Sequence, residues 1–179
     1  MLIYIYQHAG VTVYFAESLE TIGANAQEIK PNLMSVVPRL LEKVFNKIYA
    51  KGSELKGLKK LLFFWAINLG EKYEPYGKNG FFYEFQLKIA KKLIFSKWRA
   101  ALGGELETMV CGSAALHPRL SRVFCASGMM IMEGYGLTET SPVVSVGMHA
   151  NKFFKIGTVG KPISKRSFKF LQFSILSKL

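Results

Sequence analysis

The sequence predicts an α/β fold in which short strands of a parallel sheet alternate with amphipathic helices. Short apolar runs, such as residues 33–37 and 128–132, have the length and composition of buried strands. Between such runs lie longer segments whose apolar residues recur every three or four positions, which is the period of a helix packed through one face. Strands separated by helices in this way are typical of a parallel sheet.

The N-terminal part of the chain predicts a strand, a helix and a second strand. Residues 11–15 are β-branched and aromatic and favour a strand, whereas residues 2–6 alternate more weakly. A short helix is expected after Ser18 and must stop at Pro31, because the residue before a proline is pushed out of the helical region. Residues 33–37 then form the second strand, which completes a βαβ unit.

Three helices are expected between residues 38 and 104. The first begins at Pro38 and ends near Gly52, the second closes at Gly70, and residues 73–80 are a loop by composition. The second helix should face the core through Leu55, Leu58, Leu62, Trp65 and Leu69. The third should run from about Phe82 to Gly103, with Phe85, Ile89 and Leu93 inward and Lys88, Lys91 and Lys92 outward.

The strand and helix alternation resumes after residue 105. Residues 108–111 predict a strand, residues 112–115 a tight loop, and Pro118 sits well in the first turn of the helix that follows. Gly128 stops this helix, and the apolar strand 128–132 follows it.

A polar decamer at residues 133–142 follows that strand and holds the candidate site. In open α/β sheets, ligands bind at the carboxyl ends of strands, where glycines let a ligand approach the backbone. The hydroxyls of Thr138 and Thr140 could bind a phosphate, the carboxylate of Glu139 could bind Mg²⁺, and the ring of Tyr135 could stack on a base. The alternative is a capped turn in which the threonines close local hydrogen bonds and Glu139 is solvated.

Composition restricts the compartment and the partners. The formal charge is +12, from 24 basic and 12 acidic residues, which favours anionic partners. All the acids are glutamates, so an aspartate-based metal cage or triad cannot be built from this chain. Cys111 and Cys125 lie in apolar surroundings without metal-ligand spacing and predict buried, reduced thiols and a cytoplasmic location. No secretory signal pattern and no apolar run of about 20 residues is found.

The decamer resembles the signature of adenylate-forming enzymes, and with Ser141 and Pro142 it is most similar to the AMP-forming long-chain fatty acid:CoA ligases, or long-chain acyl-CoA synthetases. The Val-Pro-Arg element that ends at Arg39 and the long basic insertion after it point to the fatty-acid branch. Further similar elements occur in the same order along the chain, at residues 13–18, 30–44, 112–116 and 155–162.

This resemblance implies a partial parallel-sheet N-terminal domain of the adenylate-forming fold, with an inserted helical segment. Residues 1–163 would be part of the AMP-binding, or adenylation, domain. Residues 164–179 depart from the family pattern and would be a divergent basic tail foreign to the fold, the alternative being a purposeful basic amphipathic tail.

The resemblance also implies ATP-dependent activation of a long-chain fatty acid to an acyl-adenylate and then to an acyl-CoA thioester, with ATP, Mg²⁺ and CoA taking part. Thr138 at the α-phosphate and Glu139 as the Mg²⁺ ligand would be the catalytic residues, and Tyr135 would stack on adenine. The implied cofactor-binding residues are Gly112, Ser113, Ala114, Glu133, Gly134, Tyr135, Gly136 and Thr138.

Other readings stay open at this point. The small residues of the loop 112–115 also suit a tight turn that packs closely, and Cys111 and Ser113 depart from the family's usual serine and glycine. The family's pyrophosphate loop, ribose aspartate, hinge, catalytic lysine and CoA site are not recognised in this sequence, so we expect that the isolated chain does not form acyl-CoA.

The alternative function is a basic membrane-surface or interaction module without catalysis. Its amphipathic helices and tail would engage anionic lipid headgroups, and such contacts would also place a cytoplasmic ligase peripherally on the inner membrane surface. Nucleic-acid binding is not expected, because the aromatic residues lie on predicted core stripes and are not interleaved with lysine and arginine on one surface.

Overall fold

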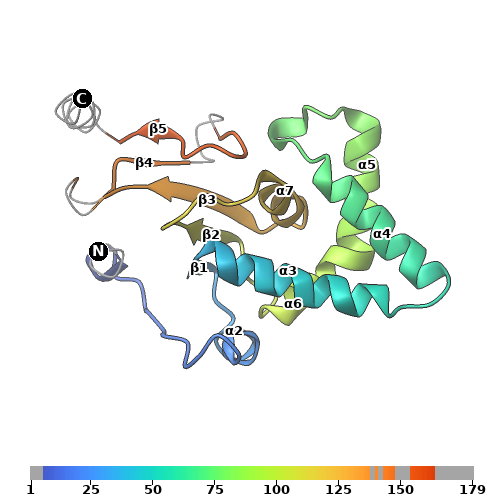
Figure 1. Cartoon of the computed structure of the whole chain (residues 1–179), viewed down its shortest axis with the longest axis horizontal. Helices are drawn as coiled ribbons and strands as arrows, with labels where there is room; N and C mark the ends of the chain where they lie inside the picture. The colour runs from blue at the N-terminus through green and yellow to red at the C-terminus, as the bar shows by residue number, and fades with distance from the viewer. Residues whose placement is uncertain (1–5, 138–139, 141–142, 148–153, 164–179) are drawn as a thin grey trace.

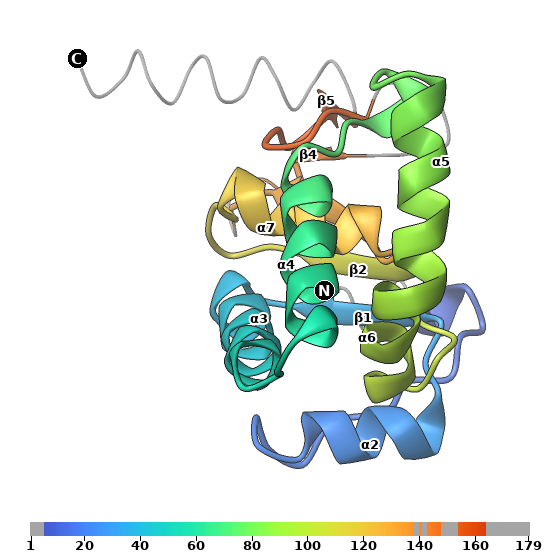
Figure 2. The ribbon, with the colours of Figure 1, turned by 90° about the vertical axis from the view of Figure 1, so that its right-hand side faces the viewer.

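The protein is described here by a computed structural model that covers residues 6–137, 140, 143–147 and 154–163 (Figure 1). Its centre is a five-stranded sheet in the order β1-β2-β3-β4-β5. The strands are β1 Leu33–Val36, β2 Thr108–Cys111, β3 Met130–Tyr135, β4 Ser145–Val146 and β5 Lys161–Pro162. Helices lie against this sheet and extend beyond one end of it, which confirms the predicted α/β class (Figures 1 and 2).

The first three strands are parallel and end at the same edge of the sheet. Val36 lies opposite Cys111, and Cys111 lies opposite Glu133, so the three strands come to their carboxyl ends side by side. From that edge β3 continues into the polar decamer and pairs antiparallel with β4, and β4 pairs antiparallel with β5. The decamer therefore starts as strand, because Glu133 is the last residue of β3 paired with β2, and Gly134 and Tyr135 continue the strand beside β4.

Two crossovers connect the parallel strands. The second is short and consists of α7, Pro118–Ala126, between β2 and β3. The first is long and carries most of the helical residues, and Figure 2 shows its helices stacked beside the sheet. It contains α3 Pro38–Ser53, α4 Leu58–Glu71, a 3₁₀ turn at Pro75–Gly77, α5 Phe81–Ala90, a π-helical turn at Lys91–Phe95 and α6 Ser96–Ala101.

Local sequence signals fix where these helices start and stop. The helix α2, Ile22–Ile29, ends at Lys30, which adopts a left-handed conformation with φ of 50° immediately before Pro31. The helix α7 starts at Pro118, and the His117 ring accepts a hydrogen bond from the Arg119 backbone N–H at 3.2 Å. Gly128, with φ of 93°, follows α7 and turns the chain into β3.

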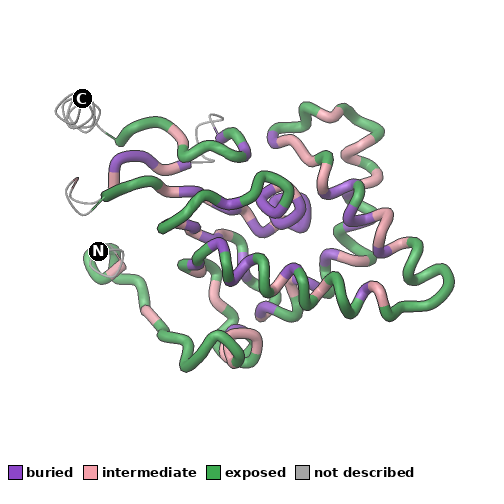
Figure 3. The backbone as a smooth tube through the Cα atoms, in the orientation of Figure 1, coloured by how far each residue is buried: buried purple, intermediate pink, exposed green. Residues whose placement is uncertain are grey.

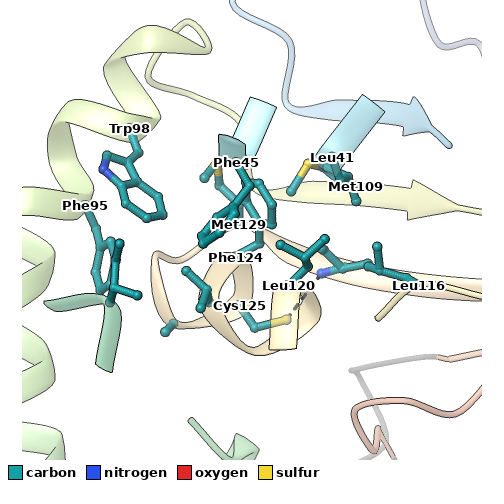
Figure 4. Close-up of a cluster of buried hydrophobic side chains, with 14 of the residues drawn as sticks. Leu41, Phe45, Phe95, Trp98, Met109, Leu116, Leu120, Phe124, Cys125 and Met129 are labelled. Carbon is teal, nitrogen blue, oxygen red and sulfur yellow. Dashed lines mark hydrogen bonds between the residues drawn. The ribbon is translucent and has the colours of Figure 1, made fainter. Parts of the chain in front are cut away.

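One hydrophobic core joins the sheet to both crossovers (Figure 4). Phe124 of α7 and Phe95 of the π turn are fully buried in it, together with Met109 of β2. Figure 3 shows the buried residues gathered along β3, α7 and the inner faces of the long crossover, while the N-terminal segment is almost entirely exposed. None of the described helices has the length and apolar composition that a membrane span requires.

The predicted N-terminal strand is not formed. Residues 11–16 are irregular, and the side chains of Val11, Tyr14 and Phe15 are exposed because no described strand lies alongside to take up their backbone hydrogen bonds. The predicted strand–helix–strand unit at this position is therefore wrong. Residues 2–5 lie outside the described residues.

The predicted inward face of the second helix is only partly confirmed. Leu69 is buried and Trp65 packs against the core as predicted, whereas Leu58 is 73% exposed. The other residues that α4 buries are Phe63, Ala66, Ile67 and Gly70. Gly52, predicted to end the preceding helix, lies inside α3 and is buried against the Phe63 ring. α3 and α4 are in close contact at this point.

The third predicted helix faces the core through the opposite side from the one expected. Phe82, Phe85, Ile89 and Leu93 are exposed. The residues that α5, the π turn and α6 bury are Leu87, Ala90, Phe95 and Trp98. The predicted outward position of Lys88, Lys91 and Lys92 is confirmed, since all three are exposed.

Candidate functional site

An open cavity of about 500 Å³ lies at the carboxyl ends of β1, β2 and β3. The three strand ends contribute residues 35–37, 110–113 and 134–136 to its lining. Volumes of this order are typical of sites for small organic ligands. The position is the one that the sheet topology predicts for a ligand site, because parallel strands present their polar loops at this edge.

The cavity brings together two segments that the sequence had singled out separately. Gly112 and Ser113 come from the loop after β2, and Gly134, Tyr135 and Gly136 come from the end of β3 and the start of the decamer. These residues are more than 20 positions apart in the chain and meet because β2 and β3 are neighbours in register.

Two other predicted site residues, Ala114 and Glu133, do not line the cavity. Ala114 is exposed and Glu133 is buried. Thr138 and Glu139 lie outside the described residues, so their roles stay predictions. Among the described residues, no group of three histidine, cysteine or acidic side chains could hold a metal ion.

The two glycines that flank the β2–β3 contact differ in what their missing side chains allow. A Cβ on Gly134 would lie 3.3 Å from Cγ2 of Val146, so a glycine there lets β3 approach β4 closely. A Cβ on Gly112 would meet nothing closer than the Gly134 carbonyl oxygen at 3.9 Å. Ser113 follows with φ of 73°, a left-handed conformation that turns the chain sharply out of β2. The two glycines thus add no side-chain atoms beside the cavity at the ends of β2 and β3.

Tyr135 ends β3 at the rim of the cavity and is 42% exposed. Its carbonyl oxygen accepts a hydrogen bond from the Val144 N–H at 2.9 Å, and it lies opposite Ser145 in the antiparallel pair. The backbone of Tyr135 is therefore held by β4 while its ring remains accessible to a ligand.

A hydrogen-bonded turn follows Tyr135. The Thr140 hydroxyl accepts a hydrogen bond from the Leu137 N–H at 3.0 Å and lies 2.9 Å from the Leu137 carbonyl oxygen, to which it donates. The Thr140 N–H also bonds to that carbonyl at 3.1 Å. The capped-turn interpretation of the decamer therefore holds for Thr140, whose hydroxyl donates and accepts hydrogen bonds within the turn.

Glu133 is buried and does not line the cavity. Its side chain is 7% exposed, and burial raises the pKa of its carboxyl group, an effect partly offset by hydrogen bonds from the Leu116 and Gly157 backbone N–H groups. Through these hydrogen bonds Glu133 connects β3 to the loop before α7 and to the turn before β5. The period of two along a strand could have indicated this, because Glu133 shares a face of β3 with buried Ile131.

The two cysteines are buried free thiols, as the sequence predicted. Burial raises the pKa of both Cys111 and Cys125 to about 11, so both are protonated near neutral pH. Cys111 ends β2 and also lines the cavity, where it contributes an uncharged wall.

Sequence reasoning missed the apolar wall of the cavity. Leu19 and Ile22 at the start of α2, and Val37 and Leu40 at the start of α3, line the side formed by β1. The available signal was the position of Val37 and Leu40 directly after a parallel strand, where the strand-end rule places ligand contacts. No lysine, arginine or glutamate is among the lining residues of the described chain.

Three comparisons relate the chain to known proteins. Residues 1–172 match the family described as AMP-binding enzyme. The long-chain-fatty-acid–CoA ligase FadD15 of Mycobacterium bovis is 33% identical over 165 residues, a match that covers 90% of this chain and 27% of that protein. The long-chain-fatty-acid–CoA ligase ACSBG2 of Homo sapiens is 31% identical over 137 residues, covering 74% of this chain and 21% of that protein.

Long chain acyl-CoA synthetase 3 of Arabidopsis thaliana is 32% identical over 139 residues, covering 75% of this chain and 20% of that protein. The chain thus spans about a quarter of the length of the curated relatives it matches. Among solved structures, the anthranilate CoA ligase in complex with anthranoyl-AMP aligns with a TM-score of 0.44 and 16% identity, covering 85% of this chain and 20% of that one.

Proposed function

Because this chain belongs to the AMP-binding enzyme family, we propose that it forms part of an AMP-forming ligase that activates long-chain fatty acids. The names of several relatives support a long-chain fatty acid and CoA as substrates, and the family supports ATP as the third. The activity, these substrates and a cytoplasmic location are proposed for the whole protein, of which this chain spans a part.

The proposed reaction has two steps. A carboxylate oxygen of the fatty acid attacks the α-phosphorus of ATP, the bond from that phosphorus to the pyrophosphate oxygen breaks, and an acyl-adenylate and pyrophosphate form. The thiolate of CoA then attacks the acyl carbon, and AMP leaves with the electrons of the broken bond. Catalysis of this kind depends on positioning and on compensation of phosphate charge.

The observation that supports the proposal is the meeting of residues 112–113 and 134–136 in one cavity at the strand ends. Gly112 and Gly134 leave room for a ligand beside the backbone, and the ring of Tyr135 is accessible. Both features suit a flat adenine base. The wall of Val37, Leu40 and their neighbours suits uncharged parts of an acyl-adenylate.

The phosphate charge must be met by other groups, because the described lining carries no cationic side chain. Thr138 and Glu139 follow directly on the cavity residues, and we assign them to the α-phosphate and to a Mg²⁺ ion respectively. When bound, Mg²⁺ would shield the triphosphate charge. Glu133 is assigned to holding the loops around the site, and not to nucleotide contact.

Binding of a stable acyl-adenylate mimic, palmitoyl-sulfamoyl-adenosine, tests the proposal without requiring turnover. Calorimetric titration of the chain should give saturable binding, and Tyr135→Ala should weaken it by about tenfold, since loss of an aromatic stacking contact costs roughly 1–1.5 kcal/mol. Tyr14→Ala is the matched control, because Tyr14 is an exposed tyrosine that does not line the cavity.

Absence of saturable binding would count against the site, as would equal effects of Tyr135→Ala and Tyr14→Ala. Sulfamoyl-adenosine without the acyl chain should bind more weakly than the palmitoyl compound. Equal affinities would mean that the acyl chain does not contribute to binding, and the cavity would then be assigned to the nucleotide alone.

A further inference from the structure

The outward side of α5 carries a stripe of large apolar side chains. We define the α5 face as Phe81, Phe82, Phe85, Ile89 and Leu93, whose exposed fractions are 89%, 74%, 56%, 39% and 45%. Residues 82, 85, 89 and 93 are three or four positions apart, so they lie on one side of the helix and of the π turn that continues it. Contiguous exposed apolar surface of this kind marks an interaction site more often than chance exposure.

The orientation of α5 is fixed by its packing on α4, so the exposure of this face is built into the fold. The Tyr83 hydroxyl donates a hydrogen bond to the Leu69 carbonyl oxygen at 2.7 Å. Leu87 and Ala90, on the same side of the helix as Tyr83, are buried at 1% and 0% exposure. With that side buried, the helix has no means of turning the α5 face inward.

The surroundings of the α5 face are strongly basic. Residues 78–97 contain five lysines and one glutamate, a difference of +4. Lys88, Lys91 and Lys92 are exposed and lie on the same two turns as Ile89 and Leu93. Their long side chains can extend past an apolar stripe and place their ammonium groups at its border.

We propose that the α5 face docks the protein on an anionic lipid membrane. Phenylalanine, isoleucine and leucine would enter the boundary between headgroups and acyl chains, and the lysines would contact the anionic headgroups. An anionic membrane matches both features of this surface, because its acyl region takes up apolar side chains and its headgroups attract the bordering lysines. A protein partner would have to supply both a groove and an excess of acids.

The α5 face and the cavity use different parts of the molecule. The carboxyl ends of β1 to β3 point away from α4 and α5, which lie toward the other end of the sheet (Figure 1). No residue of the α5 face lines the cavity. A test of membrane binding through the α5 face is therefore independent of the proposed nucleotide site.

Vesicle flotation with the full chain tests the proposal. The chain should float with phosphatidylcholine vesicles that contain phosphatidylglycerol, float much less with phosphatidylcholine alone, and lose binding as salt is raised. Phe82→Ser with Phe85→Ser should weaken binding by at least about tenfold, since two aromatic side chains lose their apolar contact. Lys88→Glu with Lys92→Glu should abolish the preference for anionic vesicles.

Leu58→Ser with Leu61→Ser is the matched control, because both leucines are exposed on α4, at 73% and 67%, outside the α5 face. This variant should float like the parent, and all variants should keep the parent's circular dichroism and its affinity for the adenylate mimic. A chain ending at Ile163 should also float, which separates the α5 face from the basic residues 164–179.

Three results would overturn the proposal. The first is no flotation of the parent chain. The second is flotation that survives the Phe82→Ser, Phe85→Ser change but is lost from the chain ending at Ile163. The third is self-association of the parent without lipid binding, measured by analytical ultracentrifugation and lost in the Phe82→Ser, Phe85→Ser variant. That result would make the α5 face an interface between two copies of the chain.

Discussion

At the scale of single residues, Glu133 and Gly134 are successive positions of β3 and therefore belong to opposite faces of the strand, and this divides the motif between two tasks. Gly134 and the residues after it line the cavity, while Glu133 is buried on the side of Leu116 and Gly157. Only 7% of the residue is exposed, so the carboxyl group has lost most of its hydration. A residue of the motif can thus be required for the shape of the site without contacting a ligand.

The raised pKa of Glu133 predicts a pH dependence of stability. The folded chain holds this proton more tightly than the unfolded chain, whose glutamate has the usual pKa of 4.5. The stabilisation is fully present below that value and is lost as the pH rises through the folded pKa. Glu133→Gln cannot ionise but keeps an oxygen that can accept a backbone hydrogen bond, so its stability relative to the parent should improve across this window.

Urea unfolding at a series of pH values above and below 4.5 measures this difference. The gain should approach about 1.4 kcal/mol for each unit by which folding raises the pKa. Glu107→Gln, at an exposed position just before β2, is the control and should follow the parent at every pH. Parallel curves for the parent and Glu133→Gln would show that the carboxyl group is hydrated in the folded chain.

The site could be predicted from the sequence only where chemistry and strand position agreed. Small residues and an aromatic side chain after apolar strands predicted that Gly112, Ser113 and residues 134–136 belong to one site, and these residues line one cavity. Their contact with a nucleotide stays a prediction. The apolar wall that includes Leu19 and Leu40 was not predicted. The position of Leu40 just after β1 was a signal for it, whereas Leu19, in the turn before α2, gave none until the fold placed it. Thr138 and Glu139 stay predictions.

At the scale of elements, α5 shows why periodicity can identify a helix and still misorient it. Residues 81–98 carry apolar side chains on two sides, so both Phe82-Phe85-Ile89 and Leu87-Ala90 fit a helical stripe. Packing on α4 selects the second stripe. The π turn then allows Ala90 and Phe95, five positions apart, to face the same core, a spacing that an α-helix would place on different sides.

Strands were predicted well where their partners are present. The boundaries of β2 are those expected, and β1 and β3 differ from expectation at their ends only. Residues 11–15 have an equally strong strand composition, yet they remain irregular and exposed. Strand propensity expresses how well side chains fit a pleated surface beside other strands, and it cannot form a strand without that surface.

The crossing of α3 and α4 makes a prediction about two helical glycines. A Cβ on Gly52 would collide with the Phe63 ring of α4, whereas a Cβ on Gly23 in α2 would meet no atom within 4 Å. Gly52→Ala should therefore destabilise the chain by about 1–3 kcal/mol through overpacking. Gly23→Ala should stabilise it by roughly 0.5–1 kcal/mol, because alanine is the better helix former.

Thermal and urea unfolding of both variants provide the measurement, and each variant serves as the control for the other. The chemical change is the same and both sites are helical, so only the neighbouring ring distinguishes them. A stabilising effect of Gly52→Ala would mean that α3 and α4 are not in close contact at this point.

At the scale of the whole molecule, the long crossover shares its core with the sheet and does not form a separate unit. Phe95 and Trp98 from the crossover lie in the same cluster as Met109 of β2 and Phe124 of α7 (Figure 4). Two ion pairs, including Arg119 with Glu71 at 2.6 Å, also join α7 to the crossover, but such exposed pairs contribute little to stability.

The apolar contacts should therefore make the crossover and the sheet unfold together, and Phe124 allows a test. Its side chain is fully buried, so Phe124→Ala should lower the free energy of unfolding by about 3–5 kcal/mol. Both tryptophans of the chain, Trp65 and Trp98, belong to the crossover, so their fluorescence reports on that segment while far-ultraviolet circular dichroism reports on all elements.

If the core is shared, the fluorescence and dichroism transitions should coincide in the parent and move by the same amount in Phe124→Ala. Leu61→Ala, at an exposed position on α4, should leave both within about 0.5 kcal/mol of the parent. A fluorescence transition that stays in place while the dichroism transition moves would show that the crossover unfolds on its own. In that case a sheet with its cavity and a helical segment with the α5 face would be two separate cooperative units.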